Sequence, residues 1–425
     1  MITVGLDFGT HQTKVCIENK KGTERSYSFM KFEDATGTMQ FTLPSIISIG
    51  KDRRLNYGYI TEETKGTVIR YFKQATFRNN KESLLSQKDA MLYSIWYLSY
   101  IIFDLEAVYG QDFVIQMGAP TDSSHVDNAK SIAVQLLASA YKLVEDLFSN
   151  DKEAFLNSTI EELLDLTNII PYSKKIKENY GILVFPEAYA CLNPLVNLGK
   201  VSRGMSLMVD IGGGTTDISF FTIENGLPQV YDFFSINKGL NFLTATSADK
   251  MAGRIDSNVK SSNEITKERI LIFESEIREE CQKLIKRIIS HFQSQTQFNV
   301  ERIKEALKTR PIIYCGGGST FQILRKPYAG FSEIHLISSA EWDVRSIRDM
   351  GNIRDNNLVP ILSTSYGLSI SRAHDNIKKK PLQDLFAHMK GLGEDYKLRN
   401  SEPKNDLFGR AFGGFSYSDD FDAWK

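Results

Sequence analysis

The chain has 425 residues, of which 42% are hydrophobic and 24% are charged, and its formal net charge is −1. This is the composition of an ordinary globular protein that is long enough to form two sizeable domains. A net charge so close to zero provides no broad electrostatic attraction to nucleic acid or to anionic lipid. We therefore expect no nucleic-acid partner, and other partners have to be inferred from individual sites.

The cysteines and histidines favour neither disulfides nor a zinc site. The four cysteines are far apart and form no CxxC pair, so we expect buried free thiols in a reducing compartment. The six histidines form no HxxxH pair and no His/Cys cluster. The sequence starts on a strand pattern without a basic and apolar leader, which predicts a cytoplasmic protein.

The first half of the chain alternates between strand and helix patterns. Apolar runs predict strands at residues 2–6, 13–18, 27–32, 46–49 and 113–120. Helices are expected over residues 84–109, over 126–147 and within the polar stretch 150–166. The longest apolar stretch, residues 91–103, is shorter than the ~18 residues that cross a bilayer, so we expect a buried helix and no membrane association.

The second half repeats this design. A strand is expected within residues 182–192, a hairpin over 207–221 and a long helix over 265–295. Residues 310–324, RPIIYCGGGSTFQIL, predict a strand that runs into a glycine turn and a helix, a geometry that suits anions and nucleotides.

The stretch LMVDIGGGTTDISFF, residues 207–221, is the most informative in the chain. Three successive glycines predict a tight turn between two strands, with φ > 0 available and with backbone close to a ligand. Asp210 ends the first strand, and Thr215 and Thr216 add hydroxyl groups beside backbone N–H groups. The pattern favours a cradle for phosphate and a hydrated cation, and a flexible hairpin tip is the alternative.

An internal echo of this stretch lies near the N-terminus. LDFGTHQTKVCIEN follows the same pattern, D-x-G-x-x-x-T-x-[VI], which begins at Asp7 in one copy and 203 residues later at Asp210 in the other. Each copy begins a series of strands followed by helices. The echo therefore predicts a duplicated α/β unit.

A series of motifs resembles the nucleotide-binding domain of the seventy-kilodalton heat-shock chaperones, within the actin-like ATPase superfamily. In chain order the matching segments are GLDFGT, LPSIISI, RYFKQATF, FVIQMGAPTDSSHVDNA, VFPEAYACL, DIGGGTTD, GGGST and SYGLSI. The resemblance covers residues 1–372 and implies two duplicated ribonuclease-H-like lobes, residues 1–195 and 196–377, with a nucleotide cleft between them. Residues 378–425 would form a helix and a tail.

The resemblance also implies a site for ATP or ADP with Mg²⁺. Backbone N–H groups of two loops would grip the phosphates, with Thr hydroxyls as added donors, at Gly9, Thr10, His11, Gly212, Gly213, Gly214 and Thr215. Asp7 and Asp210 would hold Mg²⁺ through water, because Mg²⁺ gives up its hydration shell reluctantly. The implied catalytic residues are Lys73, Glu187, Asp210 and Thr215, with the Lys73 ammonium near the γ-phosphate.

The third glycine turn would contribute Gly316, Gly317, Gly318 and Ser319. Phe321 stands where those chaperones carry an arginine against adenine, so its ring either stacks on the base or packs in the core. The segment between the second loop and this turn is short for the family, which implies a trimmed helical subdomain. The structural alternatives are that Asp7 and Asp210 cap turns, and that Lys73 is a solvated helix residue.

The function implied is a slow, partner-regulated ATPase that acts as a conformational switch. An actin-like filament protein and a small-molecule kinase are alternatives, because both use similar phosphate loops. A protein kinase is excluded, because only six residues precede the DFG triplet at Asp7.

A substrate-binding domain of the chaperone type is not expected. A β-sandwich alone needs ~100 residues, and only 53 residues follow Arg372. The last residues, GGFSYSDDFDAWK, mix aromatic and acidic side chains, which indicates either a segment that docks on a protein partner or a passive solubilising tail. The oligomeric state, the client and the pathway stay open at this point.

Overall fold

The computed structural model describes most of the first half of the chain and separate parts of the second. The described residues are 1–61, 64, 66–77, 85–120, 126–170, 180–197, 201, 206–224, 227–236, 238–244, 267–293, 312–320, 334–336, 347–356, 358–372 and 375. Phe321 and residues 378–425, for which a base contact and a docking tail are predicted, lie outside them.

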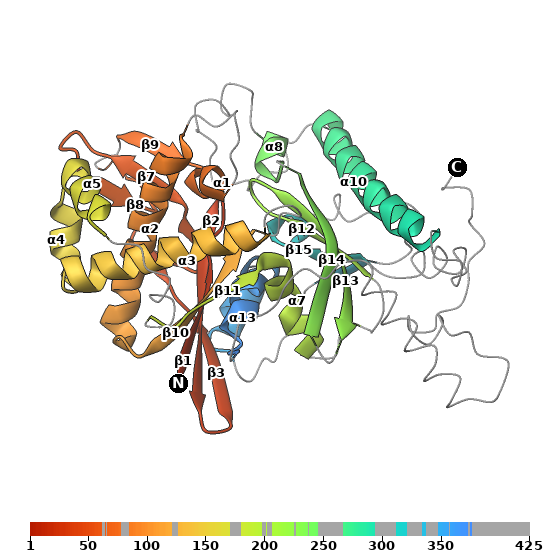
Figure 1. Cartoon of the computed structure of the whole chain (residues 1–425), viewed down its shortest axis with the longest axis horizontal. Coiled ribbons are helices and arrows are strands. Elements are labelled where there is room, and N and C mark those ends of the chain that lie inside the picture. Colours follow the sequence, from red (N-terminus) through yellow and green to blue (C-terminus); the bar gives the residue numbers. More distant parts are fainter. Residues whose placement is uncertain are drawn as a thin grey trace.

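The first lobe is built on a sheet of strand order β11-β10-β1-β2-β3, with β6 paired to β2 (Figure 1). Strands β1 and β2, and β2 and β3, are antiparallel, whereas β10 joins β1 and β11 joins β10 in parallel. The strand bounds are β1 (Ile2–Asp7), β2 (Gln12–Lys21), β3 (Glu24–Phe29), β6 (Leu43–Pro44), β10 (Phe113–Ala119) and β11 (Ile182–Pro186).

The second lobe repeats this topology in the order β14-β13-β12-β15-β16. Again the first three strands form an antiparallel meander, and the last two add in parallel beside the first. The bounds are β12 (Ser206–Ile211), β13 (Thr216–Glu224), β14 (Leu227–Ile236), β15 (Ile312–Cys315) and β16 (Ile334–Leu336). The duplicated α/β unit predicted from the echo is thus confirmed by the strand order.

Smaller elements surround the first sheet. The strands are β4 (Phe32–Glu33) paired with β5 (Met39–Gln40), and β7 (Ile46–Ile49) paired with β8 (Leu55–Tyr57) and β9 (Thr67–Arg70). The helices are α1 (Phe72–Phe77), α2 (Gln87–Tyr109), α3 (Val126–Lys142), η1 (Leu143–Leu147), α4 (Lys152–Asn157) and α5 (Ile160–Asn168). The single helix expected over residues 126–147 therefore changes at Leu143 from an α-helix to a π-helix.

Helix α2 shows how the sequence sets the bounds of an element. The Ser86 side chain accepts a hydrogen bond from the Asp89 N–H at the N-terminus, and Gly110 ends the helix with φ +70°. By length and hydropathy, α2 is the one described helix that passes as a membrane span, yet 61% of the apolar window is buried inside the molecule. This burial is that of a core helix, as the sequence predicts.

Two helices lie between the sheets, α7 (Glu187–Asn197) and α13 (Val359–Ser369) (Figure 1). A Cβ added to Gly5 of β1 would lie 2.2 Å from the Ser365 carbonyl oxygen, and one added to Gly367 would lie 1.8 Å from the Ala190 carbonyl oxygen. Helix α13 therefore touches both the first sheet and α7 at glycines. The proposed division after residue 195 passes through α7.

The remaining elements of the second lobe complete the fold. They are α8 (Asn241–Thr244), α10 (Lys267–Gln293), η3 (Gly317–Thr320) and α12 (Met350–Asp355). One apolar cluster fills the first lobe, and another joins β2 and β3 to α7, α13 and the second sheet. All four cysteines are free and buried, as predicted, at Cys16, Cys191, Cys281 and Cys315.

Candidate functional site: two D-x-G turns that face each other

The two D-x-G turns occupy equivalent places in the two sheets. Asp7 is the last residue of β1, and Asp210 is the penultimate residue of β12. In the antiparallel ladders, Asp7 lies opposite Lys14 and Asp210 lies opposite Asp217. The Lys14 Nζ–Asp7 Oδ2 distance is 3.0 Å, so the first turn carries an ion pair where the second places two carboxylates together.

The first turn is held from outside by Ser45, which belongs to the LPSIISI segment. The Ser45 hydroxyl donates to the Gly9 carbonyl oxygen at 2.7 Å, and the Ser45 N–H donates to the His11 carbonyl oxygen at 2.9 Å. The Ser45 and Thr13 hydroxyl oxygens are 3.1 Å apart. The hydrogen bonds of Ser45 to the Gly9 and His11 carbonyl oxygens therefore restrain the backbone of the first turn.

The second turn closes on itself and on α8. The Gly212 N–H donates to the Thr215 carbonyl oxygen at 2.9 Å, which makes the predicted tight turn. The Gly212 and Gly213 carbonyl oxygens accept from Leu240 and Asn241 at 3.0 and 2.9 Å. As in the first turn, backbone carbonyl groups of the second turn are held by hydrogen bonds.

The reason for the glycines differs from the one the sequence suggested. The expectation of φ > 0 within Gly212–Gly214 is wrong, because none of these three glycines has a positive φ. A Cβ on Gly213 would instead lie 2.7 Å from the His11 Cβ, and one on Gly214 would lie 2.9 Å from the Thr10 Cγ2. The glycines allow the loops of the two lobes to touch.

The third glycine turn packs on the end of β12. Gly316 has φ +72°, and a Cβ there would lie 2.3 Å from the Asp210 Oδ1. The buried Ser319 donates from its hydroxyl to the Gly316 carbonyl oxygen at 2.8 Å. Gly317 and Gly318 follow in η3. This turn therefore lies beside the D-x-G turn of the second lobe.

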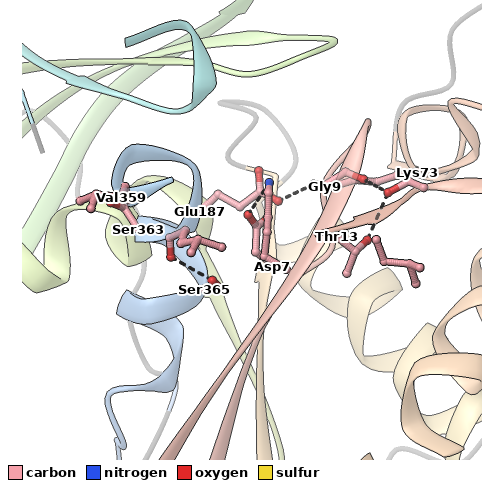
Figure 2. Close-up of polar contacts among 12 residues, drawn as sticks. Asp7, Gly9, Thr13, Lys73, Glu187, Val359, Ser363 and Ser365 are labelled. Atoms are coloured by element: carbon pink, nitrogen blue, oxygen red, sulfur yellow. Dashed lines mark hydrogen bonds and ion pairs between the residues drawn. The ribbon is translucent and has the colours of Figure 1, made fainter. Parts of the chain in front are cut away.

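Lys73 and Glu187 form a buried ion pair beside Asp7. The Lys73 Nζ lies 2.5 Å from the Glu187 Oε1, and the two side chains are 6% and 18% exposed. Figure 2 shows Asp7, Lys73 and Glu187 gathered around the end of β1. Lys73 is therefore not the solvated helix residue of the alternative interpretation.

Aromatic packing explains how Lys73 reaches this place. Phe8 follows Asp7 and is fully buried, and its ring lies 6.0 Å from that of Phe72, the neighbour of Lys73. Tyr97 of α2 stacks on Phe8 at 5.9 Å. Packing of Phe8 against Phe72 therefore places Asp7 and Lys73, the chain neighbours of these two rings, close together. Glu187 is the first residue of α7, where the helix dipole favours a negative charge.

The carboxylates of the two lobes affect one another. Burial, reinforced by the negative charges of Asp217, Asp7 and Glu187, raises the pKa of Asp210 to about 7, and Lys14 offsets this rise only in part. Burial also raises the pKa of Glu187 against the opposing effect of Lys73, with Asp7 and Asp217 adding to the rise. A pKa near 7 on Asp210 means that its negative charge is poorly compensated by the protein.

This charge distribution fits a divalent cation that arrives with a nucleotide. Among the described residues, no group of three or more His, Cys, Asp or Glu side chains is arranged to bind a metal directly. Mg²⁺ commonly keeps several waters and is held by one or two carboxylates and substrate phosphates. Asp7 and Asp210 would hold such an ion, which would offset charge on the phosphates when bound.

Two residues of this site were missed in the sequence, Lys14 and Asp217. Each directly follows the threonine of the repeated pattern, Thr13 or Thr216. The signal was present, because a residue two positions outside a tight turn faces its cross-strand partner. Both residues occupy the variable position between the threonine and the Val or Ile of the pattern, and in the two hairpins this position lies opposite Asp7 and Asp210.

We compared the chain with protein-family models, curated protein sequences and solved structures. The chain matches no protein-family model and no curated protein sequence. Among solved structures it is similar to a chain described as "MamK double helical filament", with a TM-score of 0.45 and 15% identity over 79% of this chain and 94% of that chain.

The architecture consists of two α/β lobes of one strand order, with a D-x-G turn at the same place in each, as the echo in the sequence predicts. The resemblance to the actin-like ATPases rests on the sequence motifs. The closer resemblance to the heat-shock chaperones stays a prediction.

Proposed function

We propose that the chain binds ATP with Mg²⁺ between its two phosphate loops and hydrolyses it slowly. The observation that carries the proposal is the convergence of equivalent turns from two lobes on one place, beside a buried Lys73–Glu187 pair. A nucleotide phosphate is a ligand that both backbone loops would bind in the same way. Adenine as the base rests on the family resemblance.

Each polar group at the site has a proposed role that follows from its position. Backbone N–H groups of the two loops would bind the phosphates, and Lys14, beside Gly9, would add a positive charge. Lys73 would stabilise the charge that develops on the γ-phosphate, and Glu187 would hold Lys73 in place. Asp217 would orient water near Asp210.

The test is phosphate release from ATP by the purified full chain, with and without Mg²⁺. Wild-type protein should release phosphate slowly, and Lys73→Ala and Asp210→Ala should lose turnover while circular dichroism shows that they stay folded. Lys283→Ala is the matched control, because Lys283 pairs with Glu279 and Glu280 on the exposed side of α10. Unchanged turnover in both site variants would remove this function.

A filament-forming actin-like ATPase is the second candidate, and it would use the same loops. The description of MamK as a filament belongs to that protein. Sedimentation and negative-stain imaging with ATP distinguish the two: polymer formation would establish the filament, and a soluble ATPase would favour the switch. Transfer of phosphate to a sugar or polyol instead of water would support a small-molecule kinase.

The switch role, the protein partner on residues 378–425 and the cytoplasmic location remain proposals of the same kind. In a two-lobed ATPase, loss of the γ-phosphate releases one of the bonds that holds the lobes together. The relaxation would then be transmitted to the tail. A pull-down with the full chain and with a variant that ends at residue 412 measures whether the tail captures a partner.

A further inference from the structure

The backbone and side chain of Asn241 together join three segments that line the proposed nucleotide site. Asn241 is 5% exposed and begins α8 in the second lobe. Its backbone N–H is bonded to Gly213 of the second loop. Its amide nitrogen lies 3.3 Å from the His11 Nδ1 and 3.4 Å from the Tyr71 hydroxyl, both in the first lobe.

The direction of these bonds follows from the chemistry of the groups. An amide nitrogen only donates hydrogen bonds, so in this contact the Asn241 amide donates to the His11 Nδ1. The Tyr71 hydroxyl accepts the second bond. The bridge therefore consists of two hydrogen bonds from one amide group, whereas Lys73 and Glu187 form an ion pair.

Tyr71 is placed for this contact by an unusual backbone. Its φ is +59°, in the left-handed region that non-glycine residues rarely occupy. Such a conformation persists where the surroundings hold it, here the buried Phe72 on one side and the Asn241 amide on the other. Because Lys73 follows two residues later, the contact couples the position of Lys73 to the second lobe.

We propose that Asn241, Tyr71 and His11 form an interlobe latch that sets the rate at which nucleotide leaves. This inference rests on the proposed function. A Cβ on Gly213 would lie 2.7 Å from the His11 Cβ, so the two loops touch here, and a movement of the lobes apart for nucleotide release would separate Gly213 from His11. That separation breaks both bonds of the Asn241 amide. The three residues are positioning residues that keep the loops together.

The experiment follows release of a fluorescent N-methylanthraniloyl-ADP from the full chain after mixing with excess ADP. Tyr71→Phe removes only the hydroxyl group, and we expect release to become about fivefold faster, as for loss of one neutral hydrogen bond. Asn241→Ala should accelerate release further, and adding Tyr71→Phe to it should change nothing more, because the partner is already absent. Tyr59→Phe is the control, since the Tyr59 hydroxyl donates to the Thr42 carbonyl oxygen within the first lobe.

The outcomes separate the latch from the proposed function. Wild-type release rates in both Tyr71→Phe and Asn241→Ala, or independent effects that multiply in the double variant, would overturn the latch alone. Slower release in either variant would also overturn it. If the wild-type chain binds no fluorescent ADP, the proposed function fails and the latch fails with it. Thermal melts by circular dichroism show whether Asn241→Ala is folded, and Tyr71→Phe decides the matter if it is not.

Discussion

Asp217 lies opposite Asp210 in the β12–β13 ladder, at the place where Lys14 lies opposite Asp7 in the β1–β2 ladder. The two halves of the molecule therefore share a backbone and differ in charge at this position. The first loop has an internal counterion, whereas the second has two carboxylates side by side. The two turns of the duplicated fold therefore present different charges to the space between the lobes.

Asp217→Asn tests this difference between the loops. The change removes a negative charge beside Asp210, so the pKa of Asp210 should fall toward its usual range. Nucleotide binding should persist, because the backbone N–H groups are unchanged, while phosphate release should fall at least about tenfold if Asp217 orients the attacking water. Titration with ADP and a phosphate-release assay measure the two effects. Equal turnover in the variant and the wild type would contradict the role of Asp217.

Lys73→Met should affect both stability and turnover. It leaves the Glu187 carboxylate buried without its partner, and breaking such a pair costs about 3 kcal/mol in the free energy of unfolding. Urea denaturation followed by circular dichroism measures the loss.

Combining Lys73→Met with Glu187→Gln should recover most of that stability, because the unpaired charge is removed. Turnover should stay low in the combined variant, since the ammonium group near the γ-phosphate is still absent. If stability and turnover recover together, the Lys73–Glu187 pair is structural only.

Gly213→Ala tests the contact between the loops. A Cβ there would lie 2.7 Å from the His11 Cβ, so the loops must move apart, and we expect ADP affinity to fall roughly tenfold or more. Gly351→Ala is the control, because a Cβ on Gly351 meets nothing within 4 Å and alanine favours the α12 helix. Isothermal titration of both variants with ADP gives the comparison. Unchanged affinity in Gly213→Ala would mean that the loops are not in contact in solution.

The sequence predicted the fold better than it predicted why particular residue types occur at the site. The echo of Asp7 and Asp210 was enough to predict two equivalent hairpins, because a local pattern of strand, glycine turn and strand is repeated. The sequence indicated that the glycines at 212–214 matter. The structure shows that glycine is needed at 213 and 214 because these positions contact His11 and Thr10, about 200 residues away. Such a contact depends on how two lobes pack, which no local pattern records.

The same limit explains the residues that were missed. Lys14 and Asp217 fit the polar–apolar alternation of their strands. Neither strand alone shows which residue of the neighbouring strand lies opposite them. Asn241 lies in a segment with no recognisable motif and becomes significant only through Tyr71 and His11. Lys73, by contrast, was identified through the family resemblance, and the structure pairs it with Glu187.

A separate prediction concerns the pH dependence of stability and involves the first lobe. Burial, reinforced by nearby Glu145, raises the pKa of Glu106 from 4.5 to about 7. The folded state therefore holds this proton more tightly than the unfolded state. The stabilisation is present at low pH, and the free energy of unfolding should fall as the pH rises from about 4.5 through about 7.

Glu106→Gln should remove this pH dependence, because glutamine is neutral throughout. Relative to the wild type, the variant should gain more stability at pH 8 than at pH 5, as measured by urea denaturation at both values. Glu24→Gln, at an exposed position at the start of β3, serves as the control. The same stability difference between Glu106→Gln and the wild type at both pH values would contradict the shifted pKa.

A calorimetric titration of the wild-type chain with ATP, ADP and AMP in Mg²⁺ measures whether the two loops of the two lobes bind the phosphates of one nucleotide. ATP and ADP present the β-phosphate to the backbone N–H groups of both loops, whereas AMP does not. We expect AMP to bind roughly 100-fold more weakly than ADP, the effect of losing about two hydrogen bonds to a charged group. Equal affinity for AMP and ADP, or no binding of ATP, would contradict the account.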